Sequence, residues 1–303
     1  QKRRFFYYFF GLAGAVAIGV FAFYIPLDNI SLSWLYPGQK IVASTESPYG
    51  RLVVTKKGEQ TSFFENGEHL FSTPNIFASE EIVHFALPQI KDKEKVLLVS
   101  GGIAGVIDEI MKYPVQHLDY VELDPRIISL GMKHLDIRLP PEVHVHQDDG
   151  RKFIQKTALH YNAVILDLPD PASLQLNRFY TLEFFKEIKD ILLPRGIVCF
   201  AISGAENYIS LDQASFLSTI HNSLVKVFEN VVIIPGERNI FIVSDGPLTT
   251  DIAPLISTEG IETRYVNENY LRGRITEERL SFLRRNLMND IPVNHDFRPT
   301  AYT

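Results

Sequence analysis

Four acidic side chains lie at or just after the ends of predicted strands, where they could bind a cationic substrate and move its protons. Glu122, Asp149 and Asp167 each follow an apolar segment that is typical of a buried strand, and Asp170 comes three residues after Asp167. In an open α/β sheet, ligands bind beyond the carboxyl ends of the strands. A single acid at such a position is usually a helix cap or a turn former. Three in succession indicate a ligand-binding edge.

Asp167 and Asp170 are the predicted catalytic pair. Pro169 and Pro171 stiffen the loop that carries them. Two neighbouring carboxylates suit an amine substrate, because one can hold an ammonium group while the other takes a proton so that a neutral nitrogen attacks. If the electrophile is a sulfonium, the reaction is a direct displacement at carbon. Positioning and proton removal then suffice, and no metal is required.

A glycine-rich turn precedes these acids along the chain. Residues 96–99 form an apolar run, and Gly101, Gly102 and Gly105 follow it before helical spacing begins. Backbone amides at the start of such a helix face a ligand, and a carboxylate about 20 residues on accepts hydrogen bonds from the ribose hydroxyls. Glu122 stands at that place. An ordinary βαβ crossover with glycines for close packing is the alternative, but the position of Glu122 favours a nucleoside site.

Asp149 is the candidate for contact with the nucleobase. It follows the third predicted strand and lies beside Gly150. A carboxylate there can accept a hydrogen bond from an adenine amino group. We therefore place both residues in the predicted nucleoside site.

The histidines indicate no metal site. His144 and His146 lie on one face of a predicted strand, with no third ligand nearby. We interpret them as ordinary surface or core residues. His84, on a predicted helix before the sheet, is a weak candidate for contact with the substrate.

The order of the predicted elements indicates an α/β fold. Strands alternate with helices over residues 96–243, which is typical of a doubly wound, mostly parallel Rossmann-like sheet that closes with an antiparallel hairpin. Short segments within 41–72 are separated by turn signals and predict a small antiparallel sheet. A connecting helix is expected over 79–89 and a charged helix over 276–287. The expected parts are a membrane segment (1–34), a small β-domain with its connecting helix (35–90) and a nucleoside-binding catalytic domain (91–303).

Residues 5–27 predict a transmembrane helix. They carry no charge, are long enough to cross a bilayer, and combine aromatic ends with recurring small residues. A buried core helix or a signal segment is the alternative. Residues 2–4 are basic and favour a cytoplasmic amino end. The charge bias of a single helix is weak evidence for orientation in a protein with several spans, so the side of the membrane on which the catalytic domain lies stays open. The chain begins with Gln, and we expect it to be part of a longer precursor with further membrane helices.

Composition excludes several classes of protein. The chain has 303 residues, of which 46% are hydrophobic, so it can bury a large core. A net charge of −6 and the lack of a basic stripe argue against nucleic acid as a partner. The single cysteine, Cys199, lies in an apolar strand and excludes a disulfide framework within the chain.

Several of these segments together resemble the spermidine synthase family of polyamine aminopropyltransferases. The matching pieces, in order, are SPYGRLVVT, ENG, SEEIVHFAL, VLLVSGGIAGVIDEI, VELD, DDGRKF, VILDLPDP, RFYTLEFF and LLPRG, and they cover roughly residues 47–200. The resemblance implies a small β-domain before a methyltransferase-type Rossmann domain. It also implies decarboxylated S-adenosylmethionine as aminopropyl donor and a polyamine or other small amine as acceptor. The charge-free amino-terminal segment suggests a divergent member fused to membrane helices.

The resemblance implies a role for each candidate residue. Glu122 would hold the ribose and Asp149 the adenine, Asp167 would be the catalytic acid–base residue, and Asp170 would bind the acceptor amine. His84 and Tyr180 are weaker candidates for contact with the acceptor. A homodimer is also expected.

Three departures from the family pattern bear on the substrate. The family's glycine turn reads GGGDGG, whereas Ile103 stands at the position of its aspartate. Leu70 replaces a glutamine that contacts the donor, and Phe85 replaces a glutamate of the acceptor pocket. These changes remove polar groups that complement a polycation.

We therefore expect a membrane-tethered transferase that binds S-adenosylmethionine or its decarboxylated form and transfers an aminopropyl group to an amine. Methyl transfer or another reaction of the sulfonium is the first alternative, because Ile103 removes a partner for the donor's amine. A silent nucleoside-binding domain of a polytopic membrane protein is the second.

Overall fold

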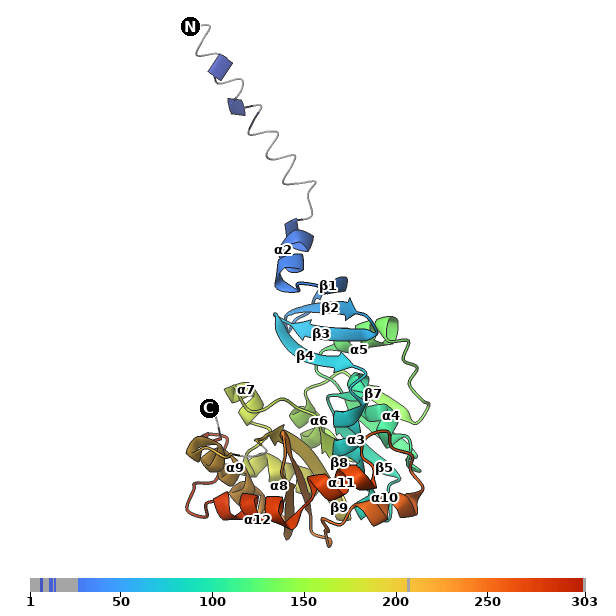
Figure 1. Cartoon of the computed structure of the whole chain (residues 1–303), viewed down its shortest axis with the longest axis vertical. Coiled ribbons are helices and arrows are strands. Elements are labelled where there is room, and N and C mark those ends of the chain that lie inside the picture. Colours follow the sequence, from blue (N-terminus) through green and yellow to red (C-terminus); the bar gives the residue numbers. More distant parts are fainter. Residues whose placement is uncertain (1–5, 8–10, 13, 15–26, 206–207, 302–303) are drawn as a thin grey trace. The chain divides into compact units, whose positions relative to one another are not determined.

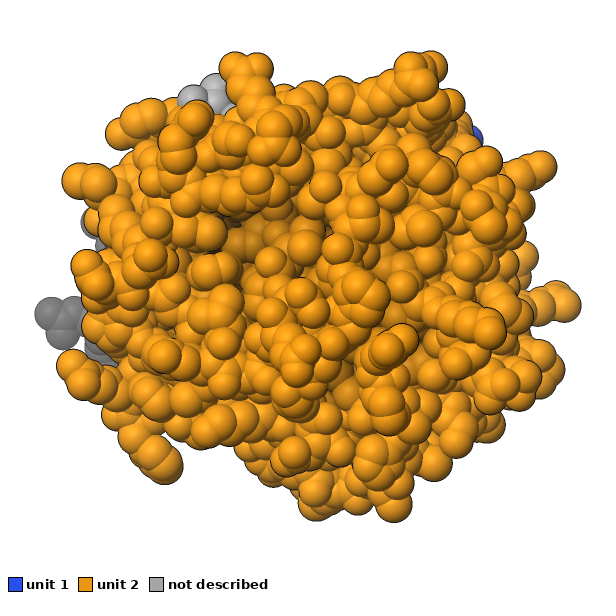
Figure 2. Space-filling model, turned by 90° about the horizontal axis from the view of Figure 1, so that it is seen from below, with its two compact units in different colours: residues 1–72 blue, residues 73–303 orange. Residues whose placement is uncertain are grey.

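The computed structural model describes residues 6–7, 11–12, 14, 27–205 and 208–301, and the chain divides into two compact units, residues 1–72 and 73–303 (Figures 1 and 2). Most of the predicted transmembrane helix, residues 5–27, lies outside the described residues. Within the described residues, no helix is both long and apolar enough to cross a membrane. The prediction for 5–27 therefore stays a prediction.

The first unit contains a short helix and the predicted small sheet. Helix α2 (Leu27–Leu35) is followed by strands in the order β1-β2-β3-β4, in which β2 pairs antiparallel with β1 and β3. Leu32, Tyr36 and Val53 form its buried cluster. The strands are β1 (Lys40–Glu46), β2 (Arg51–Lys57), β3 (Gln60–Glu65) and β4 (Glu68–Thr73).

The second unit contains the predicted wound sheet (Figure 1). Its strand order is β10-β11-β9-β8-β5-β6-β7. Strands β5 to β9 pair in parallel, and β11 runs antiparallel between β9 and β10. The predicted closing hairpin is therefore present. The strands are β5 (Lys95–Val99), β6 (His117–Val121), β7 (Val143–His146), β8 (Tyr161–Leu166), β9 (Leu192–Ser203), β10 (Asn230–Ile234) and β11 (Arg238–Ser244).

Helices connect these strands, as the alternating pattern predicts. They are α4 (Val106–Ile110), α5 (Pro125–His134), α6 (Gly150–Lys156), α7 (Leu174–Asn177), α8 (Leu182–Asp190), α9 (Leu211–Leu224), α10 (Ala253–Glu259), α11 (Glu268–Arg274) and α12 (Glu277–Asn286). Buried aromatic rings fix the middle of the sheet, where Phe200 of β9 stacks on Phe241 of β11 with ring centroids 5.0 Å apart. Contacts of this kind exclude water from the core and hold the strand ends in register.

The connecting helix and the carboxyl-terminal region differ from the prediction. The helix expected over 79–89 is α3 (Ile76–His84) followed by a 3-10 turn over Leu87–Gln89, because Pro88 lacks the amide hydrogen that an α-helix needs. Helix α3 belongs to the second unit, whereas its predicted place was with the small β-domain over residues 35–90. The predicted helix over 276–287 is α12, but α10 and α11 were not predicted.

Candidate active site

The glycine turn after β5 lies directly against the predicted catalytic acid. Gly101 has a φ of 72°, and a Cβ atom built on it would lie 2.2 Å from Oδ2 of Asp167. Only glycine lets the turn after β5 and the acid after β8 approach so closely. Ser100 also has a positive φ, 64°, which is unusual for a residue with a side chain. Two neighbouring strands thus bring the turn and Asp167 together.

Glu122 is buried at the end of β6 next to the same turn. Its side chain accepts hydrogen bonds from the Tyr120 hydroxyl at 2.9 Å and the Leu123 amide at 3.0 Å. Burial raises the pKa of Glu122 to about 7, although these bonds oppose the rise. Gly102 lies between β5 and Tyr120, since a Cβ atom there would be 2.7 Å from the ring. The carboxylate is therefore held in place and poorly solvated, and a pair of ribose hydroxyls would complement it.

Asp149 and Gly150 begin helix α6. Asp149 is the N-cap, accepting the amide hydrogen of Lys152 at 3.0 Å, and its second oxygen pairs with Arg178. Gly150 packs against Val99 at the end of β5, where a Cβ atom would be 2.5 Å from the valine side chain. Asp149 and Gly150 therefore lie at the same edge of the sheet as Gly101. Asp149 caps helix α6 there, and this role is compatible with a contact to a nucleobase.

The loop after β8 is fixed at several points. Asp167 accepts a hydrogen bond from Arg238 at 3.0 Å, and Asp170 accepts one from the Ser203 amide at the end of β9, also at 3.0 Å. Tyr180 is fully buried and donates its hydroxyl hydrogen to the carbonyl oxygen of Pro169 at 2.9 Å. Tyr180 therefore supports the loop. Asp167, with about a fifth of its side chain exposed, remains accessible to a ligand.

His84 does not reach this edge in the structure. It is fully buried, and its two ring nitrogens lie 2.8 Å from the Tyr113 hydroxyl and 2.8 Å from a Glu109 carboxylate oxygen. Helix α3 packs on α4 through these contacts. The placement favours a structural role for His84 over the predicted contact with the acceptor.

Ile103 is also a packing residue. It is buried, and the closest neighbour of Gly131 on helix α5 is its side chain, 2.1 Å from where a Cβ atom would stand. A carboxylate at position 103 would be buried here without hydrating water molecules, which is energetically unfavourable. The turn therefore offers hydrophobic packing where the family pattern offers a carboxylate.

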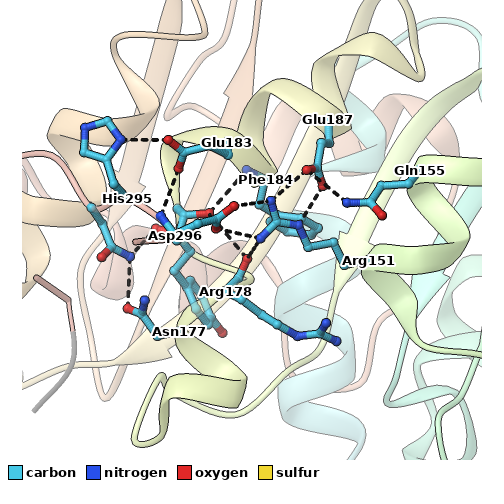
Figure 3. Close-up of polar contacts among 12 residues, drawn as sticks. Arg151, Gln155, Asn177, Arg178, Glu183, Phe184, Glu187, His295 and Asp296 are labelled. Carbon is cyan, nitrogen blue, oxygen red and sulfur yellow. Dashed lines mark hydrogen bonds and ion pairs between the residues drawn. The ribbon is translucent and has the colours of Figure 1, made fainter. Parts of the chain in front are cut away.

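A partly buried ion-pair network around Arg151 holds the segment between α7 and α8, which includes Arg178 (Figure 3). Arg151 of α6 donates to both oxygens of Glu187 and both oxygens of Asp296, at 2.7 to 2.8 Å. It also donates to the carbonyl oxygen of Arg178 at 2.9 Å. Glu187 and Asp296 are each about one-quarter exposed, so loss of one partner costs less than the about 3–5 kcal/mol of a fully buried pair.

Arg238 is a site residue that sequence analysis missed. It begins β11 and lies opposite Ser203 in the sheet register, so the antiparallel strand returns it to the carboxyl ends of β8 and β9. A signal for it exists in the sequence: a closing hairpin over 231–243 must turn at that edge.

A cavity of about 680 Å³ opens beside Arg238, within the second unit. Among the described residues, the charged side chains that line it are Glu81, Glu237, Arg238, Arg274 and Arg279. Phe77 and Tyr270 supply aromatic surface, with their rings 5.3 Å apart and nearly perpendicular. A cavity of this size accommodates a small molecule.

Comparison with known proteins places this arrangement in a family. Spermidine synthase from Thermotoga maritima superposes with a TM-score of 0.67 at 18% identity, covering 82% of this chain and 87% of that one. A spermidine synthase in complex with the transition state analogue AdoDATO gives the same score at 17% identity, with the same coverage of both chains. These likenesses establish the fold.

Sequence comparison adds closer relatives. Polyamine aminopropyltransferase 2 of Aquifex aeolicus is 32% identical over 222 residues, which are 70% of this chain and 45% of the relative. Polyamine aminopropyltransferase 2 of Ralstonia nicotianae is 29% identical over 198 residues, 62% of this chain and 38% of the relative. The chain spans less than half the length of these relatives. Residues 75–235 match the family described as Spermine/spermidine synthase domain. The chain belongs to the spermine/spermidine synthase family.

Proposed function

We propose that this chain transfers an aminopropyl group from decarboxylated S-adenosylmethionine to an amine acceptor. The observation that carries the proposal is the contact between Asp167 and the glycine turn at Gly101. A nucleoside that hydrogen-bonds to Glu122 and lies along this turn directs its sulfur end toward Asp167. The names of the relatives, polyamine aminopropyltransferases, support the same reaction.

Asp167 acts as the base in this mechanism. One proton of the acceptor ammonium passes to its carboxylate, so the nitrogen gains a free electron pair. The nitrogen then bonds to the donor carbon attached to sulfur, the carbon–sulfur bond breaks, and its electrons neutralise the sulfonium. The products are a secondary ammonium and methylthioadenosine. Asp170, held by the Ser203 amide, stabilises positive charge beside the reacting nitrogen.

Methyl transfer from intact S-adenosylmethionine is the second candidate. The burial of Ile103 favours it, because the turn then offers no carboxylate at that position to a donor that carries a bare amine. The two reactions leave different products: aminopropyl transfer releases methylthioadenosine, whereas methyl transfer releases S-adenosylhomocysteine.

An assay with each donor and a panel of primary amines distinguishes the two candidates. We expect decarboxylated S-adenosylmethionine to release methylthioadenosine in proportion to the amine consumed, measured by chromatography and mass spectrometry. S-adenosylhomocysteine formed from the intact donor would replace the proposal by methyl transfer. Tight nucleoside binding without any product would support the silent binding domain.

We also propose that residues 5–27 attach the protein to a membrane. The absence of charge over this length carries the proposal. The full chain is expected to stay in the membrane fraction after an alkaline carbonate wash. Val16→Arg combined with Val20→Arg should release most of it, because each charge near the centre of a span costs about 2.5–3.5 kcal/mol. Release of the unaltered chain by carbonate would contradict the attachment.

A further inference from the structure

The cavity beside Arg238 carries the wrong charge for a polycation. Three arginines and two glutamates line it among the described residues, which leaves a formal surplus of one positive charge. Arg238 links this cavity to the reacting acid, because the same guanidinium lines the cavity and donates to Asp167 at 3.0 Å. With Asp167 included the group is neutral, which suits a molecule that carries one charge of each sign.

The carboxylate of Glu81 is buried and already paired with an arginine. One of its oxygens accepts a hydrogen bond from Nε of Arg274 at 3.0 Å and another from the Tyr270 hydroxyl at 2.5 Å. Both members of the Glu81–Arg274 pair are at most 5% exposed. An ammonium would compete with a buried arginine for this carboxylate, and that exchange gains little.

Arg238, unlike Glu81, is partly exposed and can bind a charged group of a ligand. Its side chain is about one-third exposed, and planar guanidinium groups bind carboxylates through two parallel hydrogen bonds. In an α-amino acid the nitrogen is separated from the carboxyl carbon by a single carbon atom. A carboxylate that binds Arg238 therefore leaves its amine next to Asp167, the partner of that same arginine.

We infer that the acceptor is an aminocarboxylate, with its carboxylate on Arg238 and its amine on Asp167. The inference rests on the proposed aminopropyl transfer and specifies its acceptor. The amine loses one proton to Asp167 and forms the new nitrogen–carbon bond. The carbon–sulfur bond breaks with its electrons going to sulfur, so the products are an N-aminopropyl amino acid and methylthioadenosine. The acceptor's carboxylate is unchanged.

Pairs of acceptors that differ only by a carboxylate test this inference. Ornithine is putrescine with one added carboxylate, and lysine is cadaverine with one added carboxylate. With decarboxylated S-adenosylmethionine as donor, we expect kcat/KM for each amino acid to exceed that of its diamine by at least about tenfold, the value of one charge-assisted contact. A tenfold preference for the diamines would overturn the inference while confirming aminopropyl transfer.

Arg238→Gln separates the role of this guanidinium from general charge. The preference for ornithine over putrescine should fall by about tenfold or more in this variant, because the carboxylate loses its partner. Arg272→Gln is the matched control: Arg272 is on α11, is exposed, and pairs with Glu268 outside the cavity lining. An unchanged preference in Arg238→Gln would refute the contact.

A binding measurement tests the inference even if none of the acceptors reacts. Calorimetry in the presence of saturating methylthioadenosine compares ornithine with putrescine without requiring turnover. Tighter binding of ornithine, lost in Arg238→Gln, would support the inference even if the proposed reaction failed. Tighter binding of putrescine would end it.

Discussion

Asp167→Asn is expected to lower the rate of aminopropyl transfer by about a thousandfold while nucleoside affinity changes less than about threefold, since a positioned general base contributes roughly 10²- to 10⁴-fold. Asparagine has the same shape as aspartate, so it fits against Gly101 and can still accept the hydrogen bond from Arg238. What it cannot do is take a proton. Single-turnover rates and the calorimetric Kd for methylthioadenosine separate the two effects.

Asp190→Asn is the matched control for this experiment. Asp190 ends α8, is exposed, and loses one negative charge in the same way. Its rate should stay within about twofold of the wild type, as expected for a surface substitution. If Asp167→Asn retained more than a tenth of the wild-type rate, Asp167 would not be the base. A binding domain without catalysis would show no rate to lose.

Glu122→Gln is expected to weaken nucleoside binding by about 10- to 150-fold, the equivalent of the 1.5–3 kcal/mol of a hydrogen bond to a charged group. The same substitution should stabilise the unliganded protein at neutral and alkaline pH. Both effects have one cause: the carboxylate of Glu122 is buried and therefore poorly solvated in the unliganded protein.

The sign of the pH effect follows from the pKa of Glu122. Burial raises this pKa to about 7 in the folded protein, against 4.5 for an exposed glutamate. The folded state thus holds the proton more tightly than the unfolded state, and stability is lost as pH rises from 4.5 through 7. The free energy that Glu122→Gln restores should be near zero below pH 4.5 and reach at most about 3–4 kcal/mol above pH 8.

Thermal unfolding at a series of pH values measures this difference. The gap in Tm between Glu122→Gln and the wild type should widen between pH 5 and pH 8 and then level off. Glu229→Gln, at an exposed glutamate, should show no such trend. A gap that did not depend on pH would mean that Glu122 titrates normally. Added methylthioadenosine should narrow the gap, because it binds the wild type more tightly.

The positions of the acids at the edge of the sheet were predictable because they depend on short sequence patterns. An apolar run predicts each parallel strand, and an acid directly after it must lie at the carboxyl edge. The glycine turn at Gly101 and the acids Glu122 and Asp167 lie there in the structure. Their roles in binding and catalysis stay predictions. Asp149 shows that two interpretations can hold together, since it caps α6 at the same edge.

The cavity could not be predicted, because long-range contacts make it. Glu81 and Arg274 are 193 residues apart, and Asp167 and Arg238 are 71 apart. Helix α11, which carries Arg274, has only seven residues and therefore shows too little periodicity to be recognised. The placement of His84 has the same origin: its partners Glu109 and Tyr113 lie 25 and 29 residues away.

The anchoring of Arg151 by Asp296 has a consequence for biosynthesis. Helix α6 leaves the ribosome 145 residues before its partner, and domains form during translation from the amino-terminal side. Until residue 296 has been made, the Arg151 guanidinium has only one of its two carboxylate partners, Glu187. Until residue 294 has been made, the carbonyl oxygen of Tyr180 also lacks the hydrogen bond that Asn294 donates. Nascent chains therefore contain the sheet edge with Gly101, Glu122 and Asp149 well before these hydrogen bonds fix the segment between α7 and α8.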